Sequence, residues 1–180
     1  MRIKVIVISL SEDVDRRARF AADAPEDGLD WQFFDAHRKP TGGLSYDPAD
    51  ALVAKGRHLT PGELGCYSSH YATWRQLLGD DVDGYVVLED DVFVDWNFLD
   101  ALAGQDLSAE GISFLRLYYK LPERALVRRK NFVRRSTSLV ELLDLSFGIQ
   151  GYFIGKPAAA RFTRQFAKIV RPIDDQMDRH

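Results

Sequence analysis

The chain has 180 residues, of which 46% are hydrophobic and 28% charged, a composition typical of a globular protein and not of a disordered one. Its 24 Lys and Arg and 27 Asp and Glu give a net charge of −3, which argues against nucleic acid as a partner. One cysteine excludes an internal disulfide and a cysteine-rich zinc site. No apolar stretch approaches the roughly 20 residues of a membrane-spanning helix, so we expect no membrane span. The length fits a single domain over residues 1–180, and the one cysteine fits a reducing compartment such as the cytoplasm.

The N-terminal half alternates between predicted strands and helices. We expect strands at residues 3–10 and 29–34, and helices at 12–22, from Asp47 onward, and from 60 to about 78. The last helix has the clearest start, because Thr60 and Glu63 have the spacing of a capping box. Its apolar side chains recur every three or four residues and predict one buried stripe, made of Leu64, Tyr67, Tyr71, Trp74 and Leu78.

The C-terminal half continues this alternation. We expect strands at 85–88, 112–119 and 152–154, strand or loop at 139–145, and helices from 95 to about 103 and at 158–170, the last ended by Pro172. Strands separated by helices predict an α/β domain with a mainly parallel sheet flanked by helices. Ligands of such sheets bind outside the carboxyl ends of the strands, where Glu89, Asp90 and Asp91 follow a short apolar run.

Charges are segregated along the chain. Residues 76–115 contain acids but no Lys or Arg, and residues 116–135 are strongly basic. Such blocks are usually solvated faces. Consecutive carboxylates raise one another's pKa unless a cation compensates, however, and Glu89 and Asp91 would share a face if the backbone stayed extended. Their oxygen ligands favour Mg²⁺ or Mn²⁺ over zinc, while a solvated turn or a helix-capping cluster remains the alternative.

Two further patterns are candidates for chemistry on or near helices. Cys66 and His70 are four residues apart on the capped helix, with Glu63 on the same side; packing is a better explanation than a catalytic cysteine. Neither a P-loop nor a dinucleotide-binding glycine motif is present. Backbone N–H groups near Ser9 and Leu10, with the guanidinium groups of Arg16 and Arg17, are a candidate diphosphate site; the alternative is a solvated helix face.

Glycine and acidic residues mark two later segments. Gly148 and Gly151 flank the start of a short apolar run, where glycine permits either the close approach of a ligand or a tight turn. Asp174 and Asp175 follow Pro172, where a loop would present a general base.

These segments, in this order, resemble glycosyltransferase family 25, which includes the bacterial lipooligosaccharide and lipopolysaccharide galactosyltransferases. The motifs that carry the resemblance are residues 7–10 with Arg16-Arg17, Phe34-Asp35-Ala36, residues 59–70, residues 87–92, Gly151-Tyr152 and Pro172-Ile173-Asp174. The helix motif and the Leu-Glu-Asp-Asp-Val motif are specific in combination, and together the segments cover almost the whole chain.

The resemblance implies a GT-A-like, Rossmann-like fold and inverting transfer of a hexose, galactose first, from a UDP-sugar to a saccharide or lipid-linked glycan in surface glycan (lipopolysaccharide) biosynthesis. It also implies a divalent metal, Mn²⁺ or Mg²⁺, for which Glu89 and Asp91 are the candidate ligands. Asp174 is the first candidate for the base, with Glu63 and His70 as rivals. Candidate donor-binding residues are Ser9, Leu10, Arg16, Arg17, Asp35, Ala36, Asp90 and Gly151.

Length and charge lead to two further expectations. Family members typically continue past the Pro-Ile-Asp segment, so we expect this chain to be either shortened at its C-terminus or a short member. The basic segment 124–135 is expected to contact either anionic membrane lipids, from the cytoplasmic side, or an anionic glycan. The competing interpretations are a non-catalytic nucleotide-sugar or glycan-binding module and an Mg²⁺-dependent phosphoryl-transfer enzyme.

Overall fold

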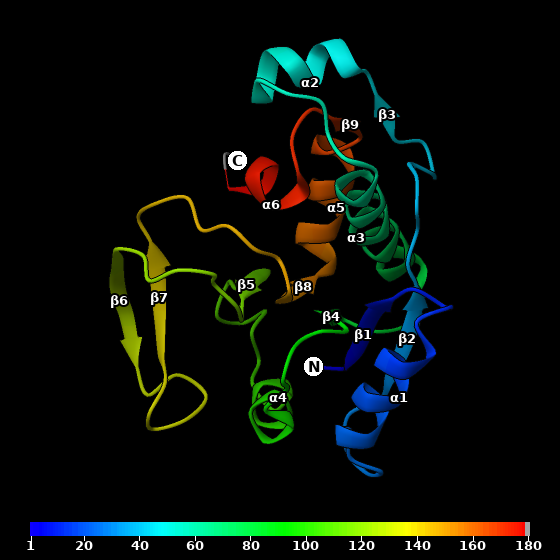
Figure 1. Cartoon of the computed structure of the whole chain (residues 1–180). Helices are drawn as coiled ribbons and strands as arrows, with labels where there is room; N and C mark the ends of the chain where they lie inside the picture. The colour runs from blue at the N-terminus through cyan, green and yellow to red at the C-terminus, as the bar shows by residue number, and fades with distance from the viewer. Residues whose placement is uncertain (179–180) are drawn as a thin grey trace.

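A five-stranded sheet in the order β2-β1-β4-β8-β5 lies at the centre of the computed structural model, which describes residues 1–178 (Figure 1). Its strands are β1 (Ile3–Ser9), β2 (Trp31–Asp35), β4 (Gly84–Glu89), β5 (Phe114–Arg116) and β8 (Gly151–Gly155). Strand β1 pairs in parallel with β2 and β4, whereas β8 is antiparallel to both β4 and β5. The predicted α/β class is confirmed, with a sheet that is mixed and mostly parallel.

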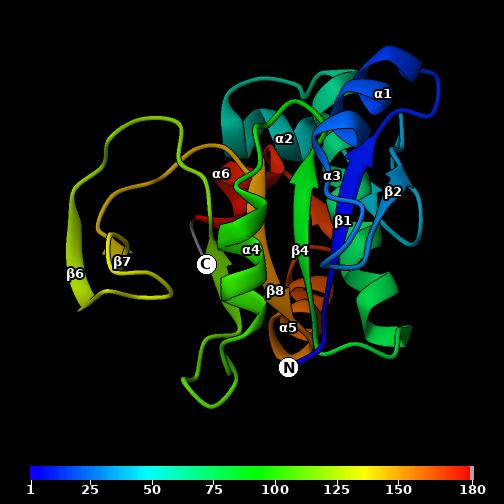
Figure 2. The same cartoon turned by 90° about the horizontal axis from the view of Figure 1, so that it is seen from below.

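Helices cover both faces of this sheet, with α3 (Pro61–Gly79) and α5 (Lys156–Gln165) on one face and α1 (Val14–Asp23) and α4 (Trp96–Ala103) on the other (Figure 2). The described residues also form α2 (Pro48–Lys55) and the short helix α6 (Ile173–Met177). Side chains alternate along β1, so Ile6 and Ile8 pack in the core with α3 and α5, and Val5 and Val7 pack in the core with α1 and α4. None of the helices within residues 1–178 has the length and apolar character needed to cross a bilayer.

Helix α3 is buried over much of its surface because it packs against both the sheet and α5. Tyr67 and Trp74 are fully buried, and the Tyr67 hydroxyl donates a 2.9 Å hydrogen bond to the backbone oxygen of Phe166 beyond α5. The predicted stripe is wrong at its last member: Leu77 is fully buried, whereas Leu78 is 40% exposed. Leu77 belongs to the core cluster that α3 shares with α5 and the sheet, so the buried face of the helix is wider than one stripe.

The predicted capping box at the start of α3 is confirmed. The Thr60 hydroxyl accepts a hydrogen bond from the Glu63 backbone N–H, and the Glu63 carboxylate accepts one from the Thr60 N–H. Arg57 also donates to both oxygens of this carboxylate, at 2.6 and 2.9 Å. The hydrogen bonds from Arg57 lower the pKa of Glu63 to about 2.

Several predicted boundaries in the C-terminal half are wrong. Helix α5 ends at Gln165 rather than at residue 170, because the chain turns into β9 (Lys168–Ile169), which pairs with β3 (Ser45–Tyr46). The strand expected at 112–119 is shortened to β5. Pro172 precedes the short helix α6 instead of opening a loop, consistent with the tolerance of proline at helix starts.

The basic segment forms the hairpin of β6 (Ala125–Lys130) and β7 (Ser138–Leu142), which lies to one side of the sheet (Figure 1). Most of its arginines are engaged in ion pairs with acids of the same chain. These pairs are Arg124–Asp144, Arg128–Glu141, Arg129–Glu110 and Arg134–Asp95. The segment therefore presents much less unpaired positive charge than its sequence indicates.

Replacing the α3 cap tests its contribution to stability. We expect Thr60→Ala to lower the free energy of unfolding by about 1 kcal/mol, because the Glu63 N–H loses its acceptor. Urea unfolding followed by circular dichroism measures this difference. Ser136→Ala is the matched control, since its exposed hydroxyl makes no hydrogen bond within residues 1–178. Equal stability of the two variants would contradict a stabilising cap.

The lowered pKa of Glu63 predicts a pH dependence. Its ionised form stabilises the fold above its ordinary pKa of 4.5, and this contribution is lost as the pH falls toward about 2. The stability difference between wild type and Glu63→Gln should therefore shrink over that range in urea unfolding. Glu26→Gln, at an exposed carboxylate outside the ion pairs of residues 1–178, should show no such trend. A difference independent of pH would refute the role of the ionised form.

Candidate functional site

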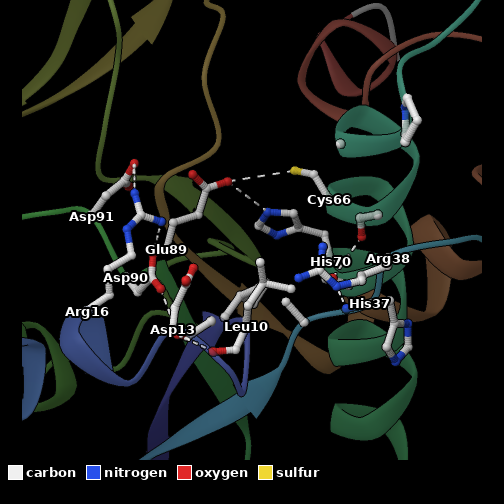
Figure 3. Close-up of a pocket in the computed structure, with 17 residues that line it drawn as sticks. Leu10, Asp13, Arg16, His37, Arg38, Cys66, His70, Glu89, Asp90 and Asp91 are labelled. Atoms are coloured by element: carbon white, nitrogen blue, oxygen red, sulfur yellow. Dashed lines mark hydrogen bonds and ion pairs between the residues drawn. The ribbon is translucent and has the colours of Figure 1, made fainter. Parts of the chain in front are cut away.

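A cleft of about 520 Å³ opens where β1 and β4 end (Figure 3). Because these strands are parallel, their carboxyl ends meet at one edge of the sheet, with Ile8 aligned to Glu89. The expected site residues that line the cleft are Ser9, Leu10, Arg16, Ala36, His70, Glu89, Asp90 and Asp91. The structure thus brings together residues from the N-terminal strand and helix, α3 and the acidic triplet.

The triplet does not keep the extended geometry considered from sequence, because the chain turns after Glu89. The Asp90 side chain is only 6% exposed and points toward α1, where its carboxylate accepts hydrogen bonds from the Ser9 hydroxyl at 2.6 Å and Arg16 Nη1 at 2.9 Å. Arg16 Nη2 lies 3.8 Å from an Asp91 oxygen. One guanidinium group therefore balances two of the three carboxylates.

Glu89 points instead toward α3. Its Oε1 atom lies 3.8 Å from the Cys66 sulfur and 3.4 Å from His70 Nε2 (Figure 3). Burial raises the pKa of Glu89, but the His70 and Cys66 contacts and the charge of Arg16 outweigh it, so its pKa is lowered overall. Burial raises the pKa of the Cys66 thiol well above its usual value, which disfavours a nucleophilic thiolate.

The donor chemistry of Glu89 and Asp91 fits a hard divalent cation. Burial and then the charge of Glu89 raise the pKa of Asp91, so the two carboxylates repel each other with only partial compensation by Arg16. A bound Mg²⁺ or Mn²⁺ would relieve this repulsion and prefers oxygen ligands of this kind. Both side chains therefore supply oxygen ligands of the kind that such an ion prefers.

A second cavity, of about 320 Å³, lies beside the first and shares Gly62, Cys66 and Glu89 with it. Asp174 lines this second cavity, as does Glu63. Asp174 is held by two backbone donors, Gly148 N–H to Oδ2 and Asp175 N–H to Oδ1, both at 2.9 Å.

The backbone of Gly148 favours glycine, because its φ of +97° is one that other residues rarely adopt. An added Cβ would also lie 2.9 Å from the Tyr118 ring.

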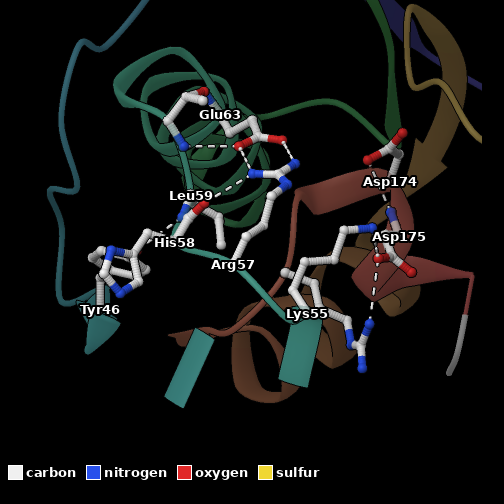
Figure 4. Close-up of polar contacts among 10 residues, drawn as sticks. Tyr46, Lys55, Arg57, His58, Leu59, Glu63, Asp174 and Asp175 are labelled. Atoms are coloured by element: carbon white, nitrogen blue, oxygen red, sulfur yellow. Dashed lines mark hydrogen bonds and ion pairs between the residues drawn. The ribbon is translucent and has the colours of Figure 1, made fainter. Parts of the chain in front are cut away.

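The surroundings of Glu63 and of Asp174 differ (Figure 4). The Glu63 oxygens accept hydrogen bonds from Arg57 and from the Thr60 N–H of the α3 cap. These contacts give Glu63, one of the rivals to Asp174 as the base, a structural role at the start of α3. Next to Asp174, Asp175 is 1% exposed and pairs with Lys55 at 2.6 Å, which joins α6 to α2. This ion pair fixes the short helix that carries Asp174.

Three expected donor-binding residues lie outside the cleft lining. Arg17 donates to the Ser9 backbone oxygen at 2.8 Å and to Asp35 at 2.6 Å, so it ties the end of β1 to the end of β2. Asp35 is otherwise exposed. Gly151 pairs with Leu88 in the sheet and lines a separate small pocket with it. These residues support the edge of the sheet rather than the cavity surface.

The cleft also contains residues that the sequence analysis missed, notably His37, Arg38, Gly65 and Ser69. The His37 N–H donates to the Ser69 hydroxyl at 2.8 Å, which joins the loop after β2 to α3. An added Cβ at Gly65 would lie 2.4 Å from the His37 backbone oxygen. A glycine inside a well-capped helix was the available sequence signal, because it marks a close backbone approach.

The sequence of this chain is similar to those of several known proteins. The family model described as "Glycosyltransferase family 25 (LPS biosynthesis protein)" matches residues 2–177. Procollagen galactosyltransferase 1 of Danio rerio is 27% identical over 183 aligned residues, which cover 96% of this chain and 30% of that protein. The lacto-N-neotetraose biosynthesis glycosyltransferase LgtE of Neisseria meningitidis is 31% identical over 170 residues, which cover 89% of this chain and 60% of that protein.

A third relative carries a different description. The human "Inactive glycosyltransferase 25 family member 3" is 32% identical over 125 residues, which cover 64% of this chain and 21% of that protein. The chain thus spans less than two thirds of the length of each of these relatives. The family model nevertheless covers nearly all of it, in agreement with the resemblance of its motifs, and the chain belongs to glycosyltransferase family 25.

Proposed function

We propose that this chain transfers a hexose, with galactose as the first candidate, from a UDP-sugar to a saccharide hydroxyl during surface glycan synthesis. The observation that carries the proposal is the meeting of two cavities at Glu89, one with Arg16 and the acidic triplet and the other with Asp174. Two substrates would approach each other there. The names of the galactosyltransferase and lacto-N-neotetraose biosynthesis relatives support this choice of reaction.

The larger cavity is our candidate donor site, in a GT-A-like arrangement. Arg16, held by Asp90, places a guanidinium group beside the Ser9–Leu10 backbone, where a diphosphate needs positive charge and hydrogen-bond donors. Glu89 and Asp91 are the proposed ligands of Mn²⁺ or Mg²⁺. When bound, such an ion would stabilise the negative charge of the departing diphosphate.

The smaller cavity is our candidate acceptor site, with Asp174 as the base. Inversion by a single displacement requires a group that takes the proton of the acceptor hydroxyl. Asp174 is a carboxylate held in place by backbone donors and facing this cavity. His70, the remaining rival, is fully buried and already contacts Tyr152 and Glu89, so it is less available to an acceptor.

A non-catalytic nucleotide-sugar or glycan-binding module is the second candidate function. It is favoured by the human relative described as inactive, which has an identity similar to that of LgtE. Acidic residues in both cavities favour catalysis over binding alone. Contact with an anionic membrane has weaker support, because four arginines of the basic segment are ion-paired within the chain.

Metal dependence can be tested by measuring hydrolysis and transfer with a panel of UDP-sugars. We expect turnover with Mn²⁺, its loss with EDTA, and a decrease of about 100-fold in Asp91→Asn, since the variant loses a charge that holds the ion. Asp27→Asn, at an exposed aspartate outside the ion pairs of residues 1–178, is the control. Full activity in EDTA, or no binding of any UDP-sugar by calorimetry, would refute the proposed reaction.

The role of Asp174 is tested separately. Asp174→Asn keeps the shape of the side chain but removes its basicity and one of its two acceptors for backbone N–H groups. We expect kcat to fall by about 100-fold or more while donor affinity stays unchanged. Transfer kinetics and calorimetry with the donor separate these two quantities. Unchanged kcat would exclude Asp174 as the base, and equal losses of affinity and turnover would indicate a binding role.

A further inference from the structure

Cys66, His70 and Glu89 form a cluster with a different chemical character from the oxygen pair of Glu89 and Asp91. Their sulfur, nitrogen and oxygen ligand atoms converge from α3 and the end of β4 and all lie within 4.8 Å of one another (Figure 3). We propose that these three side chains form a separate site for a zinc-class metal ion, which takes Glu89 away from the Mn²⁺ or Mg²⁺ site.

The geometry of the cluster is close to that of bound zinc. In a tetrahedral site, the usual bond lengths place cysteine sulfur, histidine nitrogen and carboxylate oxygen roughly 3.4 to 3.6 Å apart. Here the distance from His70 Nε2 to Glu89 Oε1 is 3.4 Å, and the distance from Cys66 Sγ to the same oxygen is 3.8 Å. The third pair, the Cys66 sulfur and a His70 ring nitrogen, lies within 4.8 Å, so closing around an ion brings these side chains closer together.

The residues behind the cluster also suit a metal-binding histidine. His70 Nδ1 lies 3.0 Å from the Tyr152 hydroxyl, which accepts a 2.8 Å hydrogen bond from Trp74 Nε1. Tyr152 and Trp74 are fully buried, so the imidazole ring has a fixed orientation. With its proton on Nδ1 donated to Tyr152, His70 would present the Nε2 lone pair to the ion, as metal-binding histidines usually do.

The fourth coordination position is open. Cys66 and Glu89 line both cavities, so water or a ligand can complete the coordination from either side. Three protein ligands and one open position are typical of accessible zinc sites rather than closed structural ones. On binding, the Cys66 S–H bond breaks, its proton passes to solvent, and the sulfur bonds to the ion without any change in oxidation state.

The zinc-class site and the Mn²⁺ or Mg²⁺ site both use Glu89, so the two cannot hold a metal with all their ligands at the same time. A soft sulfur and an imidazole nitrogen select zinc, whereas Asp91 and Glu89 select hard ions. If the proposed function is correct, micromolar zinc should inhibit Mn²⁺-supported transfer, and Cys66→Ser should relieve this inhibition. This consequence rests on the proposed function, whereas metal binding to the cluster does not.

Cobalt(II) is the direct probe because a cysteine-ligated cobalt ion has a sulfur-to-metal charge-transfer absorption. The chain has one cysteine, so any such absorption in the monomer reports Cys66. We expect one equivalent of Co²⁺ to produce the band in reduced wild-type protein and stoichiometric Zn²⁺ to abolish it. Cys66→Ser should lose the band altogether.

Matched variants identify the other ligands. Losing a residue that only hydrogen-bonds to a metal ligand typically weakens metal affinity by about 10- to 100-fold. His70→Gln and Glu89→Gln remove ligands themselves, so each should weaken Co²⁺ binding by more than this. Asp91→Asn should keep the band, as should His58→Gln, which changes an exposed histidine. Circular dichroism establishes whether each variant is folded. If the variant at the buried His70 unfolds, Glu89→Gln still tests the proposed ligands, because Glu89 is partly exposed.

The outcomes separate this proposal from the proposed function. Absence of the band in folded wild-type protein, or equal affinity in wild type and Glu89→Gln, overturns the zinc-class site whatever the activity. A band without any UDP-sugar turnover supports the site and contradicts the transferase. Turnover that zinc does not inhibit, in protein that shows the band, refutes the competition for Glu89.

Discussion

The position of the first turns of α3 against the carboxyl edge of the sheet is the constraint on which the site depends. The Thr60–Glu63 cap determines where the helix starts, and Gly65 permits the His37 backbone to approach within a distance that any side chain would block. Cys66 and His70 then face the end of β4. Any displacement of this helix would separate them from Glu89 and also change the wall common to the two cavities.

The acidic triplet is divided between two environments by the turn after β4. Glu89 faces α3 and the side chains of Cys66 and His70, while Asp90 faces α1 and pairs with Arg16. Asp91 is exposed and only partly compensated by Arg16, 3.8 Å away. Three adjacent residues of similar chemistry therefore lie in three different environments, and only Asp90 is held closely by a guanidinium group.

Local patterns predicted much of the fold, because the caps of α2, α3 and α4 and the apolar runs of β1 and β4 are signals within a few residues. They placed the acidic triplet at the sheet edge correctly. Two predictions were wrong because they depend on long-range contacts. The helix expected to reach residue 170 ends earlier, since Ile169 pairs with Tyr46 in a strand, and Leu77 rather than Leu78 is buried in the core that α3 shares with α5. The contact between Glu89 and His70 depends on the crossing of α3 over β4, which spacing along the chain does not reveal.

The antiparallel insertion of β8 between β4 and β5 has a consequence for the order of folding. Strands β1, β2 and β4 and the helices between them come from the first half of the chain, whereas β8 reaches β4 only after α4, β5 and the hairpin. Closing such a long loop is entropically costly and slow. All residues that line the first cavity precede β8, whereas the Gly148–Asp174 contact of the second joins segments on either side of β8. The first cavity can therefore form early, while the second needs the strand of this sheet that comes last in the chain.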